Sequence, residues 1–291
     1  MALLLRRSAR ARRPGGARRP HIRLTGFVGV GIIAVALVGP VAGTASASTT
    51  PSFTTRLAAN WRTYLADRPG SVGVALYDRN SGRTVYVTKA LRANGWETAS
   101  TVKLDILARL LARTGQTGKL TAGQQQLAKP MISVSDNAAA SALWRQAGGQ
   151  TGMDAFFREL GMTATAAGAG GKWGLTRTTA YDQLRVLRAV SYPGGALSAS
   201  ARGTAASLLN TVVPEQRWGL TAGVPNGVRV QLKNGWLPYD GGWVVNSLAH
   251  VQGAGKDYVM AVYTRDSTTE QTGIRTIAGL SQLAWAAVPT A

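Results

Sequence analysis

The chain has 291 residues, of which 45% are hydrophobic, and its 33 basic and 13 acidic residues give a net charge of +20. This length is enough to bury a core in one or two domains. The absence of cysteine excludes disulfides, a thiol nucleophile and a lipid anchor on a cysteine. Only two histidines are present, which argues against a zinc site, and we expect neither a metal nor a cofactor.

The first 47 residues have the pattern of an export signal. Eight arginines without any acid are followed by an apolar run over 26–43 and then by Ala45-Ser46-Ala47. A basic head, an apolar run and a small-residue cleavage site predict a secretory signal peptide over 1–47 and a secreted domain over 48–291. A retained membrane anchor is the alternative, and Arg18-Arg19 leaves twin-arginine export open beside the general pathway.

The secreted part stays basic after this segment is removed. It keeps 25 basic and 13 acidic residues, a net charge of +12. The basic residues are scattered rather than grouped with aromatic residues, which argues against nucleic-acid binding. An anionic cell wall or an acidic substrate is a more suitable partner for an exported basic protein. We expect a monomer that meets the membrane only through its signal peptide.

Hydrophobic periodicity predicts the order of helices and strands beyond residue 48. It predicts a helix over 57–66 and then two strands over 72–77 and 83–87. A block of helices follows, expected over 100–114, 121–132, 137–147, 152–160, 178–190 and 198–212. The period then changes to two over 228–232, 242–251 and 257–264, before a last helix over 274–287. This order predicts an α/β (α+β) sandwich in which both chain ends build one antiparallel sheet.

The helix expected over 100–114 carries the first motif, Ser100-Thr101-Val102-Lys103. Residues three apart share a helix face, so Lys103 can reach the Ser100 hydroxyl. A helix N-terminus favours developing negative charge, and a desolvated lysine can lose its proton near neutral pH. The motif therefore predicts a serine nucleophile with an amine base, although a serine cap and a solvated lysine would have the same spacing. The only polar stripe of this helix is Asp105, Arg109 and Arg113, which is typical of a buried helix.

Two further motifs follow in chain order. In Ser135-Asp136-Asn137, the Ser135 hydroxyl could relay a proton and the Asn137 amide could bind a carbonyl, while a plain capping turn is the alternative. In Lys233-Asn234-Gly235, Lys233 could bind a substrate carboxylate, and Gly235 would let a substrate backbone lie close to the strand.

Together the three motifs resemble those of the serine β-lactamase and penicillin-binding-protein superfamily, most closely class A β-lactamases. That family's set is Ser-x-x-Lys, Ser-Asp-Asn and Lys-Thr-Gly. The resemblance implies a three-layer sandwich with an all-helical block, and an acyl-enzyme formed on Ser100. It assigns activation to Lys103 and proton transfer to Ser135, and it makes the backbone N–H groups of Ser100 and Trp236 the oxyanion hole. The substrate-binding residues that it implies are Asn137, Lys233, Asn234, Gly235 and Trp236.

The chain departs from the family pattern in two places. Asn234 replaces a small hydroxyl residue, which is expected to weaken carboxylate binding. Residues 162–177 contain no acid, whereas class A enzymes carry there a glutamate that positions the deacylating water. This loop offers Lys172 and Trp173 instead. The sequence therefore predicts acylation without the class A route for deacylation.

Several substrates and roles stay open at this stage. β-Lactams, D-Ala-D-Ala peptides and simple esters or amides compete as substrates, and a non-turnover protein that binds β-lactams or the cell wall is the alternative to an enzyme. The tryptophans near the motifs are either packing residues or an aromatic wall for an acyl group: Trp173, Trp218, Trp236 and Trp243. His250 is interpreted as a structural strand residue.

Overall fold

The sheet is built from both ends of the chain, as the sequence predicts. The computed structural model describes residues 51–90 and 93–291, so the predicted signal peptide lies outside the described residues. The five strands are β1 (Ser71–Asp78), β2 (Arg83–Lys89), β5 (Arg229–Tyr239), β6 (Gly242–Gly253) and β7 (Lys256–Ser267). Their order is β2-β1-β7-β6-β5, and each neighbouring pair is antiparallel. The N-terminal hairpin thus joins the C-terminal strands where β1 pairs with β7.

Burial along the strands reflects helices on both faces of the sheet. The central strands β6 and β7 each contain eight consecutive buried residues, over 244–251 and 258–265. The edge strand β2 instead alternates exposed and buried residues over 84–87. A strand buried on both faces loses the period of two that marks a half-exposed strand. The central strands are therefore the core of the molecule.

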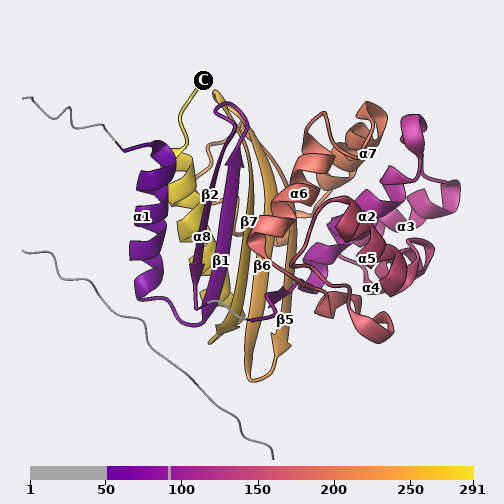
Figure 1. Ribbon diagram of the computed structural model, residues 1–291, viewed down its shortest axis with the longest axis horizontal. Coiled ribbons are helices and arrows are strands. Elements are labelled where there is room, and N and C mark those ends of the chain that lie inside the picture. Colours follow the sequence, from indigo (N-terminus) through magenta and orange to yellow (C-terminus); the bar gives the residue numbers. More distant parts are fainter. Residues whose placement is uncertain (1–50, 91–92) are drawn as a thin grey trace, which may run out of the picture. The chain divides into compact units, whose positions relative to one another are not determined.

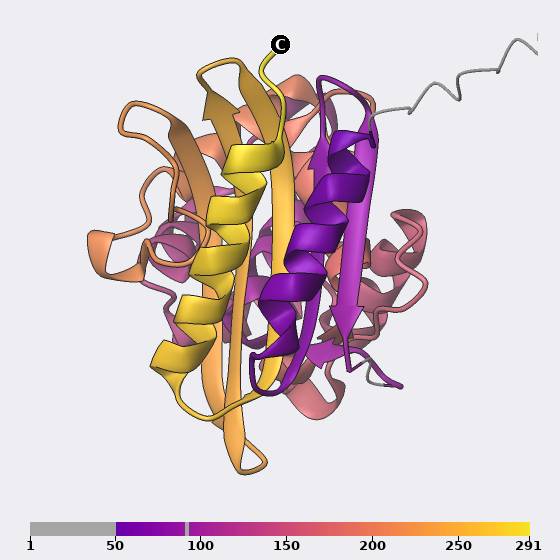
Figure 2. The same ribbon diagram turned by 90° about the vertical axis from the view of Figure 1, so that its left-hand side faces the viewer.

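One face of the sheet is covered by two helices from opposite chain ends. The helices α1 (Phe53–Ala66) and α8 (Glu270–Ala287) lie side by side over it (Figure 2). The α1 helix begins where the Ser52 hydroxyl accepts the N–H of Thr55, 3.2 Å away. In the middle of α1, the buried Trp61 ring donates a hydrogen bond to the Leu280 carbonyl, 3.1 Å away. This layer therefore ties the two chain ends together a second time.

The other face carries the helical block (Figure 1). Its helices are α2 (Val102–Ala112), α3 (Ala122–Ser133), α4 (Asn137–Gln146), α5 (Gly149–Glu159), α6 (Ala180–Ser191) and α7 (Ala199–Leu209). The α6 helix packs on β7 and β1, and α2 contacts α3, α4, α5, α6 and α7. The three layers confirm the predicted fold class. No helix in the described ranges is long and apolar enough to cross a membrane.

Four local features differ from the sequence prediction. The helix expected over 100–114 is a 3-10 turn over Ala99–Thr101 followed by α2. Asp105, expected on a polar stripe, is completely buried. The β5 strand continues to Tyr239, seven residues beyond its predicted end, because its polar residues 233 and 234 are buried by contacts that periodicity does not reveal. Two short strands, β3 (Trp96–Glu97) and β4 (Arg177–Thr178), were not predicted.

Candidate active site

Ser100 lies in the 3-10 turn that leads directly into α2, with its side chain half-buried. The residue before it, Ala99, has a φ of 48°, and Ser135 of the second motif has a φ of 61°. A non-glycine residue in this left-handed region is strained by contact of its Cβ with the backbone. Such strain is retained where the surrounding structure fixes the backbone, often at a functional site.

Two residues of the sheet hold the turn that carries Ser100. The Asn246 amide on β6 donates to the carbonyl oxygens of Glu97 and Thr98, at 2.8 and 3.0 Å. Gly235 on β5 packs directly on the turn, because a Cβ at this position would lie 2.6 Å from the Ser100 nitrogen. Any side chain at 235 would push the strand and the turn apart. The third motif therefore brings its backbone against the first one.

The Lys103 amine is surrounded by oxygens from the first two motifs. Its Nζ lies 2.9 Å from Ser100 Oγ, 3.0 Å from Ser135 Oγ, 2.7 Å from the Ser135 carbonyl oxygen and 2.8 Å from Asn137 Oδ1. Burial lowers the pKa of Lys103 to about 8, and the nearby Asp136 carboxylate opposes this shift. A neutral amine has two N–H groups and one lone pair, so one of the two hydroxyls can donate its proton to the lone pair. The geometry suits Lys103 as a base toward Ser100.

Ser135 also links the first lysine to a second one. Its Oγ accepts a hydrogen bond from the Lys233 amine at 3.1 Å, and Lys233 donates as well to the Asn234 carbonyl oxygen at 2.8 Å. Burial, and then the charge of nearby Lys103, lower the pKa of Lys233 to about 7. The hydroxyls of Ser100 and Ser135 and the amines of Lys103 and Lys233 thus form one continuous chain of polar groups.

The structure separates Asn234 from the other residues predicted to bind substrate. The Asn234 side chain is 1% exposed. Its amide donates to the carbonyl oxygens of Gln216 and Trp218, and its Oδ1 accepts from Ser247. These bonds use both donors of the amide and anchor the segment 216–218 to β5 and β6. Asn234 therefore presents its backbone carbonyl, rather than its side chain, to Lys233.

A hollow of about 310 Å³ lies beside Ser100. Its larger side chains are Asn137, Lys172, Trp173, Leu175, Trp236 and Leu237. Trp173 is fixed by a 3.0 Å hydrogen bond from its ring nitrogen to Ser141 Oγ, and its ring centroid lies 4.9 Å from the Lys103 amine. The hollow is therefore apolar along one wall and polar at Ser100.

Of the other three tryptophans, Trp236 lines the same hollow as Trp173, whereas Trp218 and Trp243 do not. The Trp218 and Trp236 rings meet edge to face with their centroids 5.7 Å apart, and Trp243 lies at the start of β6. Of the four, Trp173 contacts the catalytic lysine candidate most directly, and the sequence pattern alone did not single it out. Its only sequence signal is its position in the acid-free loop that precedes α6.

The acid-free loop is held in place by carboxylates that lie outside it. The Asp182 carboxylate on α6 accepts from the Ala164 N–H and the Thr165 hydroxyl, each at 2.8 Å. The Asp154 carboxylate on α5 accepts from the Ala167 N–H at 2.7 Å. Asp136 caps α4 by accepting from the Ala139 N–H at 2.7 Å. These three acids therefore have structural partners, and none of them contacts Ser100.

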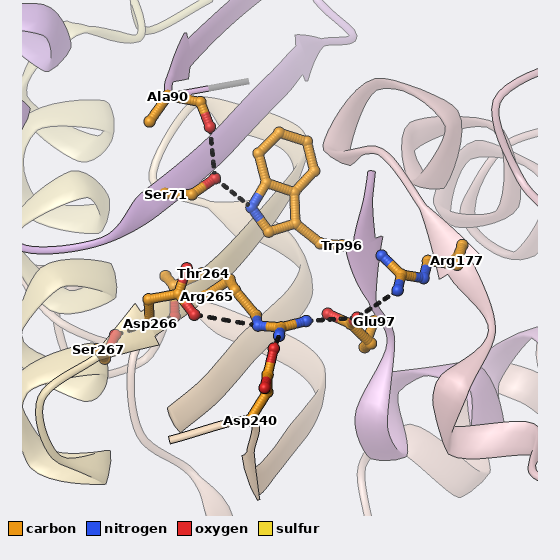
Figure 3. A network of polar contacts seen from close by, with 10 residues as sticks. All are labelled: Ser71, Ala90, Trp96, Glu97, Arg177, Asp240, Thr264, Arg265, Asp266 and Ser267. Carbon is orange, nitrogen blue, oxygen red and sulfur yellow. Dashed lines mark hydrogen bonds and ion pairs between the residues drawn. The ribbon is translucent and has the colours of Figure 1, made fainter. Parts of the chain in front are cut away.

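A buried ion-pair network supports the segment that precedes Ser100. Figure 3 shows Glu97 on β3 between Arg177 on β4 and Arg265 on β7. Glu97 Oε1 lies 3.0 Å from Arg177 and 2.5 Å from Arg265, and Glu97 is completely buried. Arg265 also pairs with Asp240 and Asp266 at 2.9 and 3.1 Å. The network fixes the backbone three residues before Ser100.

The described residues contain no group of three or more His, Cys, Asp or Glu side chains that could hold a metal ion. His250 lies on β6 with its Nε2 2.8 Å from the Asp257 carboxylate. Its placement in a strand pair agrees with the structural interpretation from the sequence. The site around Ser100 is accordingly made of hydroxyls, amines, amides and aromatic rings.

A protein-family model described as the beta-lactamase enzyme family matches residues 114–288, more than half of the chain. The match begins after Ser100 and Lys103 and includes Ser135, Asn137 and Lys233. Among curated proteins, LppW of Mycobacterium tuberculosis, a protein named as a lipoprotein, is 27% identical over 218 residues, covering 71% of this chain and 67% of its own length.

Solved structures share the fold at low sequence identity. A class A β-lactamase from Bacteroides cellulosilyticus is 17% identical with a TM-score of 0.70, covering 82% of this chain and 99% of that one. TLA-3 extended-spectrum β-lactamase is 19% identical with a TM-score of 0.68, covering 80% and 98%. The protein PBP-A is 21% identical with a TM-score of 0.67, covering 80% and 96%.

Proposed function

The chain belongs to the beta-lactamase enzyme family, and from this premise we propose that it is an exported serine hydrolase that forms an acyl-enzyme on Ser100. The observation that carries the proposal is the buried Lys103 amine, 2.9 Å from Ser100 Oγ, with its pKa lowered to about 8. At pH 7 roughly one tenth of such an amine is neutral and able to accept a proton. This supports serine activation without histidine.

Acylation then follows from the positions of the four polar groups. Lys103 takes the Ser100 proton as Oγ attacks the carbonyl carbon, and the carbonyl oxygen becomes an oxyanion. The backbone N–H groups of Ser100 and Trp236 are the proposed donors to that oxyanion. When the carbon–nitrogen bond breaks, the Lys103 proton passes through the Ser135 hydroxyl to the leaving nitrogen. The products of this step are an ester on Ser100 and a free amine.

Substrate binding is proposed to use the lysine and amide groups beside this chain. The Lys233 ammonium would pair with a substrate carboxylate, and the Asn137 amide would bind the acyl amide group. The apolar wall with Trp173 and Leu175 would hold the acyl side chain. A β-lactam has all three features. D-Ala-D-Ala peptides share the carboxylate and the amide, and simple esters share only the acyl group.

Deacylation is proposed to be slow. Residues 162–177 supply no carboxylate, and the Trp173 ring lies over Lys103 instead. An ester on Ser100 would therefore lack an acidic base for the attacking water. We expect the acyl-enzyme to accumulate.

Mass spectrometry after mixing with a penicillin tests the proposal. We expect an adduct of the penicillin mass on the peptide that contains Ser100, and no adduct in Ser100→Ala. A Ser207→Ala variant serves as the matched control, because it removes an exposed hydroxyl on α7, none of whose residues line the hollow. Absence of both adduct and hydrolysis with the wild-type protein would remove β-lactams from the substrates.

A second role is favoured by the same acid-free loop. If the adduct persists for hours without product, the protein would act as a β-lactam- or cell-wall-binding protein rather than a hydrolase. Turnover of a chromogenic cephalosporin, a thioester and a D-Ala-D-Ala peptide, measured side by side, separates the two roles. Steady product release with any of them would identify a hydrolase and its substrate class.

Export is proposed from residues 1–47 alone, with the secreted domain over 48–291. The 291 residues contain no cysteine that could carry a lipid. N-terminal sequencing of protein recovered outside the cells should begin just after Ala47. An uncut N-terminus in the membrane fraction would instead identify a retained anchor.

A further inference from the structure

A second and larger hollow lies away from Ser100, where the end of β1 meets α6 and the loop that follows α6. Its volume is about 730 Å³. Ser100 lies over one row of paired residues across the sheet, which consists of Gly235, Asn246, Tyr263 and Gly73. The larger hollow is lined by Tyr77, which lies four residues beyond Gly73 along β1. Four residues of strand span roughly 13 Å. The two hollows are therefore separate.

Three arginines line this second hollow: Arg79, Arg185 and Arg188. All three are exposed, and none of them forms a salt bridge within the part of the chain that the structure describes. Glu159 also lines the hollow, but its carboxylate pairs with Arg109 at 3.2 Å. The hollow therefore presents a surplus of positive charge.

Two of the arginines are positioned by stacking on tyrosine rings. The guanidinium carbon of Arg188 lies 4.1 Å from the Tyr77 ring centroid, and that of Arg79 lies 4.8 Å from the Tyr192 ring centroid. A guanidinium that stacks by its face keeps the N–H groups at its edge available for an anion. Stacking also reduces the entropy that an arginine loses when it binds a ligand.

The rings beneath these arginines are themselves fixed. The Tyr77 and Tyr192 rings lie 6.0 Å apart, and the Tyr192 hydroxyl donates to the Asp257 carboxylate at 2.8 Å. The same carboxylate oxygen lies 2.8 Å from His250 Nε2. Burial alone would raise the pKa of Asp257, but the hydrogen bonds from His250 and Tyr192 outweigh it and lower that pKa. The ionised Asp257 carboxylate therefore holds the Tyr192 ring in place beside the Tyr77 ring.

We propose that this hollow is a binding site for a phosphate-bearing sugar or polyol. A phosphate group has enough oxygens to accept hydrogen bonds from two guanidinium edges at once, and arginine binds it in a two-pronged geometry. The volume exceeds what one phosphate needs. The small residues Pro193, Gly194 and Gly195 line the same hollow and leave room for an uncharged body. A free small molecule and a repeating phosphodiester polymer share this chemistry.

Isothermal titration calorimetry with three probes tests the proposal: glycerol, glycerol 3-phosphate and poly(glycerol phosphate). We expect both phosphate probes to bind the wild-type domain and glycerol not to bind. The double variant R79Q/R188Q should lose at least about tenfold in affinity, the size of one or two charge-assisted bonds. The variant R62Q removes the same kind of exposed charge from α1 on the opposite face and should bind as wild type. The Ser100→Ala variant should also bind as wild type, which separates this site from the proposed acyl transfer.

The titrations distinguish a polymer ligand from a small one, and they can also contradict the proposed site. Binding of the polymer at least about tenfold more tightly per phosphate than the monomer identifies a polymer ligand, and equal binding per phosphate identifies a small one. If R79Q/R188Q binds both phosphate probes as wild type does, or if R62Q loses as much as the double variant, the site is wrong. Absence of binding of any phosphate probe to the wild-type protein overturns it as well. Thermal unfolding of each variant confirms that a loss of affinity is not a loss of folding.

Discussion

At the scale of single residues, the proposed acylation depends on the protonation state of one buried amine. Lys103 must be neutral to accept the Ser100 proton, and its pKa is lowered to about 8. The acylation rate should therefore rise with pH through a midpoint near pH 8 and level off above about pH 9, because half of the amine is neutral at its pKa and about nine tenths of it one unit higher. Stopped-flow measurement of acyl-enzyme formation across about pH 5.5 to 9.5 checks this profile.

The matched variants assign this pH profile to Lys103. Lys103→Met should lower the acylation rate by roughly 10² to 10⁴-fold, the usual contribution of a positioned base. Lys129→Met, at an exposed position of α3, should leave both rate and profile as in the wild type. An unchanged profile in Lys103→Met would show that another group accepts the proton.

Asp105 is a second buried titratable residue of α2. We expect its ionisation to affect the free energy of unfolding rather than the acylation rate. Burial raises its pKa to about 8 from the usual 3.8. Its Oδ2 accepts from the Gln183 amide at 3.2 Å, while Asp105 Oδ1 and Gln183 Oε1 have no hydrogen-bond partner in the described structure. A protonated Asp105 could donate from Oδ1 to Gln183 Oε1 and so satisfy both atoms.

The pH dependence of the stability follows from the pKa of Asp105 in the folded state, about 8, and its usual value of 3.8 in the unfolded state. Below about pH 4 the carboxyl is protonated in both folded and unfolded states, so its contribution to stability is complete there. Between about pH 4 and 8 only the unfolded state ionises, and this contribution falls steadily. Asp105→Asn can make both amide hydrogen bonds without ionising. We expect it to raise the free energy of unfolding by on the order of a few kcal/mol at pH 8 and hardly at pH 4.

Urea unfolding at the two pH values measures this difference. Asp105→Ala serves as the comparison, because it removes the ionisation but leaves Gln183 without its partner and opens a cavity. Equal stabilisation by Asn at both pH values would contradict a neutral carboxyl at this position.

At the scale of elements, the Glu97 network joins three strands that are distant in sequence. Glu97→Gln should lower the free energy of unfolding by roughly 3 kcal/mol, because it leaves the buried Arg265 guanidinium without its buried counter-ion. Asp240→Asn removes another partner of Arg265, but the Asp240 side chain is 77% exposed. That change should cost less than about 1 kcal/mol. Equal effects of the two variants in urea unfolding would contradict a structural role for the buried pair.

The sequence predicts well those elements whose signal is local. The order of helices and strands and the three-layer fold are confirmed, since periodicity and caps are read within one segment. The motif residues Ser100, Lys103, Ser135, Asn137 and Lys233 also lie together, although their roles stay predictions. Their spacing is meaningful because each motif is short and precedes or enters a regular element.

Features that depend on distant partners were not predictable in this way. The two-residue strands β3 and β4 pair across about eighty residues, and the Glu97–Arg265 contact spans 168 positions. Asp105 was expected at a polar stripe but is covered by α6, because Gln183 approaches it from another element. The only sequence signal of Glu97 is that it is a lone acid between Trp96 and Thr98, shortly before Ser100. Such burial is a property of packing between elements rather than of any one of them.

At the scale of the whole molecule, the fold depends on pairing between the two chain ends. The family model matches residues 114–288, yet this range lacks α1, β1, β2 and α2. Without β1, the strand β7 loses eight paired residues and becomes an edge, and α8 loses its neighbour α1. An exposed, long and apolar edge strand promotes aggregation instead of folding.

We therefore expect a fragment of residues 114–291 to show no cooperative thermal transition by circular dichroism, whereas residues 49–291 unfold in a single step. Addition of a second fragment, residues 49–113, should restore the transition, because it supplies the missing strands and the nucleophile helix together. A sharp transition and a native-like spectrum from the fragment 114–291 alone would contradict this dependence. The cut falls directly after Arg113, the residue that caps α2. Restored folding without restored acylation would therefore separate the pairing of the chain ends from the placement of Ser100.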